Sequence, residues 1–225
     1  MKHYTYFDIE TGPVPEAEMQ ALIPEFNPDD VKLGNLKDQK KIEAKIEAAR
    51  ENHVTNFTSK AALSPLTGQV LAIGWARDSE APITHFKSDF FDDEAGLLRA
   101  FWQEFNALNS NRIVRWVGFN ILRFDVPFLI KRSMKHGIGC PGAFDGDRFS
   151  HQWLDLFKVW QMGDYKLMQS LDKICRFMGM EGKNGNGGDF DFYFRTEPDK
   201  ADGYLINDVE ITRNLHRKFQ QTFGE

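Results

Sequence analysis

The order of strand-like and helix-like segments is the feature that most constrains the fold of this 225-residue chain. Residues 3–10 alternate between two faces as a strand does, and two apolar strands at 68–77 and 82–87 flank a polar turn that favours an antiparallel pair. The later segments read as a helix at 92–108, a strand at 112–120, a helix from Asp125, a short strand or turn at 153–160, and helices at 167–178 and 199–223. This order predicts an α/β fold, a mixed β-sheet with helices on both faces.

The segment from residue 15 to residue 63 differs from the rest of the chain. It is rich in charged, helix-favouring residues, and Ile42, Ile46 and Ala49 recur at helical spacing. Most of its charges are expected to form a solvated helix face. Because the segment has few large apolar residues, we expect it to lack a core of its own. We therefore predict a single domain over 1–225, with a helical insertion at 15–63 packed on the main body.

The composition excludes several classes of protein. Hydrophobic residues make up 41% of the chain and aromatic residues 13%, which excludes disorder as a global description. Cys140 and Cys175 are too few for a disulfide framework or a zinc cluster, so we expect a reducing, cytoplasmic location. The longest charge-free run, 61–76, contains Pro65 and Gly68 and is not expected to span a membrane. A net charge of −5 argues against a broad phosphate-binding surface, but not against a local site that uses metal ions.

Three sets of polar residues are candidates for a functional site. Asp8 and Glu10 share one face of an otherwise apolar strand. Two buried like charges are costly there unless something neutralises them, and a strand end that reaches solvent is the alternative. Asp125 follows a strand and could cap the helix that begins there. Tyr204 and Asp208 are four residues apart and therefore lie on one helix face. Each set by itself leaves a structural role open.

Taken together, in order and spacing, these segments resemble the three motifs of the DEDD superfamily of 3′→5′ exonucleases, and more narrowly the branch related to the proofreading domain of family B DNA polymerases. The motifs are Phe7–Gly12 (FDIETG), Gly118–Asp125 (GFNILRFD) and Tyr204–Asp208 (YLIND). The histidine variant of the superfamily places a histidine where this chain has Gly203, whereas Tyr204 matches the tyrosine variant, DEDDy. The resemblance covers roughly residues 2–12 and 63–219 and implies an RNase H-like fold.

The resemblance also implies a reaction and a set of roles. The expected activity is hydrolysis of phosphodiester bonds from a 3′ end, with release of nucleoside 5′-monophosphates. Four carboxylates without histidine or thiolate suit two divalent ions, Mg²⁺ or Mn²⁺. By the family pattern, Asp8 bridges both ions and Asp125 holds the second. Glu10 and Asp208 bind the ion that carries the attacking water, and the Tyr204 hydroxyl orients that water.

The expected substrate is a single-stranded or frayed 3′ end, with DNA favoured over RNA. Thr11 and Gly12 could contact the terminal sugar through their backbone, or simply end the strand. Asn120 could bind a phosphate or tie two loops together, and Phe124 could stack on a base or pack in the core. Two alternatives stay open: an exoribonuclease with the same site, and a non-catalytic binding module derived from such an enzyme. The intact carboxylates and tyrosine count against the second. The sequence does not indicate a pathway or a replication or repair partner.

Other charged residues are weaker signals. The best local basic cluster consists of Arg123, Lys131, Arg132 and Lys135. About half of these charges are expected to be ordinary solvated ones. Lys183, in the loop GKNGNGG, could contact a phosphate. Asp155 could support a metal ligand or make a structural hydrogen bond, and Asp145 and Asp147 are interpreted as loop residues rather than a metal-binding pair.

Overall fold

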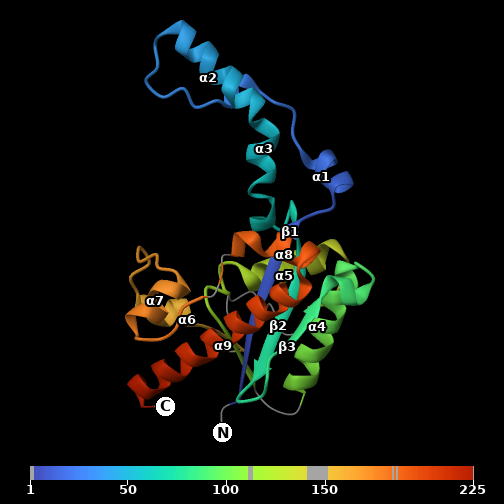
Figure 1. The fold of residues 1–225 in the computed structure, drawn as a ribbon, viewed down its shortest axis with the longest axis vertical. Helices are drawn as coiled ribbons and strands as arrows, with labels where there is room; N and C mark the ends of the chain where they lie inside the picture. Colours follow the sequence, from blue (N-terminus) through green and yellow to red (C-terminus); the bar gives the residue numbers. More distant parts are fainter. Residues whose placement is uncertain (1–2, 111–113, 141–151, 184, 186, 225) are drawn as a thin grey trace. The chain divides into compact units, whose positions relative to one another are not determined.

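The computed structural model of the chain describes residues 3–110, 114–140, 152–183, 185 and 187–224 (Figure 1). Its contacts divide the chain into two units, one made of Met1–Thr11 with Val70–Glu225 and the other of Gly12–Gln69. Within the described ranges, no helix is both long and apolar enough to cross a membrane. Asp145 and Asp147, which were interpreted as loop residues, lie outside the described residues.

A five-stranded sheet organises the larger unit, with the strand order β3-β2-β1-β4-β5. The strands are β1 (His3–Pro13), β2 (Gly68–Arg77), β3 (Ile83–Phe86), β4 (Val114–Gly118) and β5 (Trp153–Asp155). Strands β2 and β3 are antiparallel, whereas β4 runs parallel to both β1 and β5. The predicted mixed sheet and its antiparallel pair are therefore confirmed. The carboxyl ends of β1, β4 and β5 lie on one edge, where open α/β sheets bind ligands.

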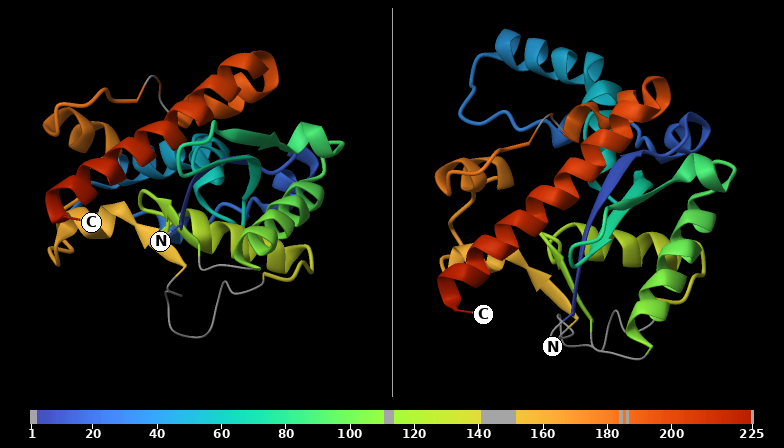
Figure 2. Two further views of the ribbon diagram at one scale, coloured as in Figure 1. Left: turned by 90° about the horizontal axis from the view of Figure 1, so that it is seen from below. Right: turned by 60° about the horizontal axis from the view of Figure 1, so that its bottom comes forward.

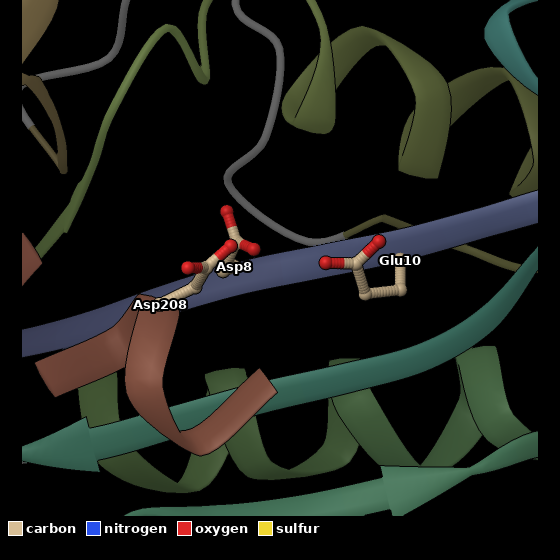
Figure 3. A group of neighbouring side chains, drawn as sticks. All are labelled: Asp8, Glu10 and Asp208. Carbon is tan, nitrogen blue, oxygen red and sulfur yellow. The ribbon is translucent and has the colours of Figure 1, made fainter. Parts of the chain in front are cut away.

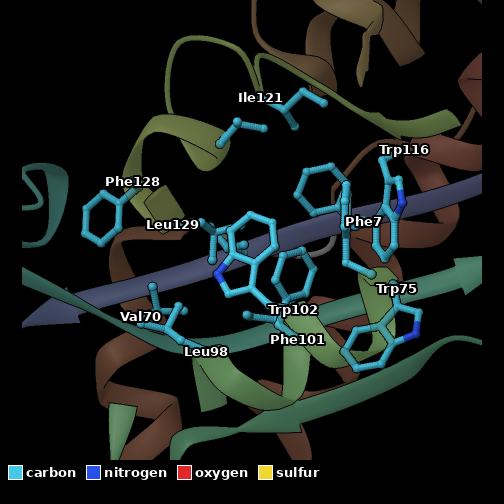
Figure 4. Close-up of a cluster of buried hydrophobic side chains, with 14 of the residues drawn as sticks. Phe7, Val70, Trp75, Leu98, Phe101, Trp102, Trp116, Ile121, Phe128 and Leu129 are labelled. Carbon is cyan, nitrogen blue, oxygen red and sulfur yellow. The ribbon is translucent and has the colours of Figure 1, made fainter. Parts of the chain in front are cut away.

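Helices cover both faces of this sheet (Figure 2). They are α4 (Glu94–Asn109), α5 (Asp125–Lys135), α6 (Leu156–Gln161), α7 (Leu171–Phe177), α8 (Phe190–Thr196) and α9 (Pro198–Phe223), with short 3₁₀ turns η3 (Lys87–Phe90) and η4 (Gly187–Asp189). The alternation in β1 sends Phe7 and Ile9 into an aromatic-rich core with α4 and α5 (Figure 4). Tyr4 and Tyr6 point the other way, into a second core with α6, α7 and α9. Both faces of β1 therefore pack against helices, and of its two acidic residues Glu10 is buried and Asp8 is half-buried.

Helix α9 packs very closely on the sheet. A Cβ atom added to Gly74 in β2 would lie 2.8 Å from Cγ of Leu205, so a larger residue there would push the helix away. On β1, the Tyr6 hydroxyl lies 3.1 Å from Nδ1 of His216, which adds a polar contact to the same interface. Leu205 sits in the turn between Tyr204 and Asp208. This close approach therefore brings the third sequence motif next to β1.

Strand β1 is longer than predicted. We expected it to stop at Glu10, before Gly12 and Pro13, but it continues to Pro13. A proline is tolerated at the end of a strand because its missing N–H is not needed in the ladder there. The N–H of Val14 then donates to the carbonyl of Thr67 at 3.0 Å, so the chain stays paired beyond the proline.

The apolar run at 153–160 divides into a strand and a helix. Strand β5 ends at Asp155, whose carboxylate accepts a hydrogen bond from the N–H of Phe157 at 2.9 Å and so caps α6. The expected short strand is therefore only three residues long. Helix α7 begins at Leu171, later than predicted, because the Ser170 hydroxyl caps its first turn at 3.4 Å.

Two further differences concern the C-terminal part of the chain. Helix α8 was not predicted, because seven residues are too few to show a helical period. Its Phe190 is fully buried, with its ring centroid 6.0 Å from that of Tyr204. The predicted apolar stripe of the last helix is buried as far as Phe219, but Phe223 is exposed. Phe223 lies in the final turn, just before Gly224 ends the helix in a left-handed conformation.

The smaller unit contains the helices predicted for the insertion. They are α1 (Glu16–Leu22), η1 (Pro28–Asp30), α2 (Gln39–Glu51), α3 (His53–Thr58) and η2 (Ala61–Leu63). A small cluster of Val14, Met19 and Ala61 is buried within this unit. Helix α2 buries no residue, and its apolar positions Ile42 and Ile46 are half-buried. The packing of the insertion on the main body stays a prediction.

Candidate metal centre

Strand β1 supplies two of the acidic residues. Asp8 and Glu10 are two positions apart, so both side chains project from the same face of the strand. Asp208 projects toward them from α9 (Figure 3). One carboxylate oxygen from each of the three residues lies within 4.8 Å of the other two. Residues about 200 positions apart in the sequence thus converge on a volume that one cation could fill.

The third sequence motif is buried at the site. Tyr204 and Asp208 lie one turn apart on α9, and only 1% of Asp208 is exposed. The Oδ1 atom of Asp208 is buried and has no hydrogen-bond partner among the described residues. An unpaired buried carboxylate oxygen is unfavourable unless something supplies positive charge.

Gly118 at the end of β4 shapes the second sequence motif. A Cβ atom at this position would lie 2.2 Å from Cγ2 of Ile121 and 3.1 Å from the carbonyl oxygen of Phe7. The chain can fold back over the end of the strand only because that Cβ is missing. Asn120, in the same turn, has a left-handed backbone with φ of 62°. An asparagine tolerates this conformation better than most residues do.

Asp155 holds this turn in place from the neighbouring strand. Its carboxylate accepts hydrogen bonds from the N–H groups of Asn120 at 2.8 Å and Leu122 at 3.1 Å, in addition to the cap on α6. Asp155 is buried and does not line the cavity. Of the two roles predicted for Asp155, the structural hydrogen bond is therefore confirmed. Asn120 is tied to β5 through its backbone, while its side-chain Oδ1 is buried without a hydrogen-bond partner among the described residues.

Asp125 is the first residue of α5, and it is not the helix cap. The cap position is Phe124, which makes no side-chain capping bond. The Asp125 Oδ1 atom instead accepts a hydrogen bond from the N–H of Ile9, at 3.3 Å. Ile9 lies between Asp8 and Glu10, so this bond draws Asp125 to the acidic face of β1. The alternative that Asp125 merely caps the helix was wrong.

Burial raises the pKa values of all four carboxyl groups, and repulsion from neighbouring carboxylates adds to the shifts of Asp8 and Glu10. Burial raises the pKa of Asp8 well above its usual range, and the charges of Asp125 and Asp208 raise it further. Burial, followed by the charge of Asp208, raises the pKa of Glu10 in the same way. Burial raises the pKa of Asp125 to about 7, and it also raises that of Asp208. Four acids that resist ionisation together create a site that favours cations.

Lys183 also belongs to this cluster, although the sequence predicted only a contact with a phosphate for it. Its Nζ atom donates a hydrogen bond to Oδ2 of Asp208 and lies 3.5 Å from the hydroxyl of Tyr204. Burial opposes the charge on Lys183, but the carboxylates of Asp8 and Asp208 outweigh it and raise the pKa of the lysine. The only signal in the sequence was the position of Lys183 in a glycine-rich loop before the last helix.

A cavity of about 500 Å³ joins these groups to a more apolar region. Its lining includes Asp8, Glu10, Asn120, Phe124, Asp125, Lys183 and Tyr204. Phe124 lines the cavity and is half-buried. Its ring also packs against that of Phe128, with the two centroids 5.5 Å apart. Thr11 and Gly12 continue β1 beyond Glu10 and are not among the lining residues. Their contact with a terminal sugar stays a prediction.

The basic cluster predicted near the second motif does not form as a surface. Arg132 is only 2% exposed, and its Nη2 atom lies 2.6 Å from Oε2 of Glu94. His136 binds the same carboxylate at 2.8 Å. A buried arginine paired in this way cannot attract a polyanion, so Arg132 was wrongly included. Arg123, Lys131 and Lys135 are exposed.

The donor set fits a divalent ion of the Mg²⁺ or Mn²⁺ type. Every side chain in the acidic cluster offers carboxylate oxygen, the ligand that these hard cations prefer, and no sulfur or imidazole ligand joins the cluster among the described residues. The unpaired oxygen of Asp208 and the raised carboxyl pKa values are the features that a bound cation would relieve.

Comparisons with known proteins agree with this geometry. A family described as a predicted 3′-5′ exonuclease related to the exonuclease domain of PolB matches residues 66–225. No curated protein matches the chain. Among solved structures, the family B DNA polymerase from the hyperthermophilic archaeon Pyrobaculum calidifontis is similar in fold, with a TM-score of 0.60 and 14% identity. The match covers 97% of this chain but only 24% of the polymerase chain.

Proposed function

The chain belongs to the family of predicted 3′-5′ exonucleases related to the exonuclease domain of PolB, and from this premise we propose that it hydrolyses single-stranded or frayed DNA from the 3′ end with two divalent metal ions. The observation that carries the proposal is the convergence of Asp8, Glu10 and Asp208, whose carboxylate oxygens lie within 4.8 Å of one another. Asp125 is close enough for its charge to raise the pKa of Asp8. A cluster of this kind is costly to fold unless cations bind it.

The acidic residues divide between two ion positions. Asp8, Glu10 and Asp208 would hold one ion, and Asp125 would help to hold a second one next to Asp8. Two such ions, when bound, would activate a water molecule and neutralise the charge on the phosphoryl and leaving oxygens. The carboxylates must be ionised for this role, and the raised pKa values mean that proton release would accompany metal binding.

Tyr204 would act as a hydrogen-bonding group and not as a base. Burial, followed by the charge of Asp208, raises the pKa of its hydroxyl above the ordinary value. The phenol therefore stays protonated at neutral pH, lines the cavity and can orient the attacking water. Lys183 would have to exchange its contact with Asp208 for another when a cation arrives, and the substrate phosphate offers it one.

Two observations support a DNA end as the proposed substrate. The related polymerase acts on DNA, which supports DNA over RNA here. The cavity of about 500 Å³ is of the size that binds small ligands, so it would hold only the end of a strand. This is compatible with a net charge of −5, because the metal ions supply the local positive charge.

A time course with end-labelled oligonucleotides tests the proposal. A 5′-labelled single-stranded DNA should shorten progressively in Mg²⁺ or Mn²⁺, and a chelator should abolish the reaction. The same strand closed into a circle should resist digestion because it has no 3′ end. An RNA strand of the same sequence, run in parallel, decides between the DNA and RNA alternatives. Fragments from the circle, or digestion in the presence of chelator, would contradict the proposal.

A further inference from the structure

The cavity carries an apolar side chain that the proposed chemistry does not use. Met168 lines the cavity, yet 65% of it is exposed. An exposed methionine needs no explanation by itself. This one differs because it shares a cavity with the carboxylates and lies beside a cation, since Nη1 of Arg123 is 3.3 Å from its sulfur. No carboxylate in the described part of the chain forms a salt bridge with Arg123.

The two neighbours of Met168 are each tied to α6, Leu167 through its backbone and Gln169 through its side chain. The side chain of Gln161 donates to the carbonyl of Leu167 at 2.9 Å, and Nε1 of Trp160 donates to Oε1 of Gln169 at 2.7 Å. These bonds anchor the segment before α7 to α6. Because the segment is already tied down, a ligand that packs against Met168 has to fix only its side chain and does not have to order the segment as well. Met168 is therefore an exposed apolar contact on an anchored segment.

The direction of the substrate strand decides what meets this surface. The inference rests on the proposed 3′→5′ exonuclease function. A strand digested from its 3′ end has no chain beyond the terminal nucleotide, so its only continuation is the part on the 5′ side of the scissile phosphate. That part must leave the cavity toward solvent. Met168 is one of the exposed lining residues, and Arg123, which is not itself a lining residue, lies against it.

We propose that Met168 and Arg123 form a subsite for the nucleotide on the 5′ side of the scissile phosphate. The thioether of Met168 packs against the face of the base, and the guanidinium of Arg123 pairs with the backbone phosphate. Every base has an apolar face that a polarisable sulfur can contact, so the subsite accepts any sequence. The contact with the Met168 thioether also limits the positions that the Arg123 guanidinium can take, so that it pairs with one phosphate.

Equilibrium binding tests the base contact without turnover. The fluorescence anisotropy of a 5′-labelled single-stranded DNA is measured against the full-length protein in chelator. The Met168→Ala variant should bind with a Kd about tenfold higher than that of the wild type, as for loss of a base-stacking contact. Met168→Leu, which keeps an apolar side chain, should stay within about twofold. Met134→Ala is the matched control, because Met134 is 68% exposed and does not line the cavity.

Salt dependence tests the phosphate contact. Each phosphate contact to a single strand contributes about 0.7 to the slope of log Kd against log salt. Arg123→Gln should therefore lower that slope by about 0.7, because Arg123 lies against the lining residue Met168, whereas Lys131→Gln, which removes another exposed cation, should leave it unchanged.

The outcomes separate this subsite from the exonuclease function. An unchanged Kd for Met168→Ala, or an unchanged slope for Arg123→Gln, would overturn the subsite, and so would a wild-type protein that does not bind the oligonucleotide. A wild-type protein that binds the strand through these residues but never shortens it in Mn²⁺ would overturn the exonuclease function alone.

Discussion

The ammonium group of Lys183 donates a hydrogen bond to the buried carboxylate of Asp208, so the acidic cluster already contains a cation of its own. The two residues come from different elements, the glycine-rich loop and helix α9. The contact neutralises part of the charge that would otherwise destabilise the metal-free protein. It also occupies one oxygen of a residue that we propose as a metal ligand.

The first prediction follows from this competition. The Lys183→Met variant should bind Mn²⁺ about tenfold more tightly in calorimetric titrations, because no charge-assisted hydrogen bond on the order of 1.5 kcal/mol has to be broken. In chelator the same variant should melt at a lower temperature than the wild type, since Asp208 loses its partner. Lys173→Met, an exposed position on α7, serves as the control. Equal Mn²⁺ affinities for wild type and Lys183→Met would contradict the competition.

The second prediction separates an acid that binds metal from one that holds the fold. Asp8→Asn removes a charge from the repelling cluster, so the metal-free protein should be at least as stable as the wild type, while activity and most of the Mn²⁺-induced stabilisation are lost. Asp155→Asn should instead lower stability by about 1–3 kcal/mol, because Asp155 accepts three backbone N–H bonds. Thermal melts in chelator and in Mn²⁺ make the comparison. A destabilised Asp8→Asn protein with the full Mn²⁺ shift would remove Asp8 from the metal centre.

The third prediction concerns the hydroxyl of Tyr204. Tyr204→Phe should lower kcat by about 10²-fold with little change in melting temperature, because only the group that orients water is removed. Tyr193→Phe, on the neighbouring helix and outside the cavity lining, should keep wild-type turnover. If Tyr204→Phe turns over at the wild-type rate, the tyrosine contributes packing alone.

The fourth prediction compares two glycines. Gly118→Ala should destabilise the protein by about 1–3 kcal/mol, since the new methyl group would lie 2.2 Å from Ile121 and disturb the turn that leads to Asp125. Gly203→Ala should stabilise it by up to about 1 kcal/mol, because Gly203 is a helical position with no atom near the added Cβ. Denaturant melts measure both changes. A stabilising Gly118→Ala would show that the turn does not need this close approach.

The fifth prediction is a pH dependence of stability. In the unfolded chain, aspartate ionises near pH 4, but burial raises the pKa of Asp125 to about 7 and that of Asp8 well above its usual range. Between about pH 4 and 7, the folded protein therefore holds protons that the unfolded chain has released, so the unfolding free energy falls as pH rises. Melting temperatures in chelator should fall across this window. Asp125→Asn should flatten the curve, and a rise with pH in chelator would contradict the prediction.

Local pattern was sufficient to predict most of the sheet and to place the acidic residues on their strands and helices. Because successive side chains of a strand point to opposite faces, the alternation in β1 places Phe7 and Ile9 in one core and Tyr4 and Tyr6 in the other. Spacing likewise places Tyr204 and Asp208 on one helix face, whatever the helix packs against. A short element was missed because it gives no such pattern. Helix α8 has too few residues to show a period, and its burial depends on residues far away in the sequence.

The sequence by itself determined which acids and which tyrosine are available, because motif order and secondary-structure period are local properties of the chain. Only the tertiary structure decided what each charged group faces. Arg132 and Arg123 are both basic residues near one motif, yet the first is buried against Glu94 and the second lies exposed beside Met168. Lys183 and Asp208 meet because a loop and a helix pack together. Burial and long-range contacts set these partners, and through them the pKa values, and neither can be deduced from local spacing.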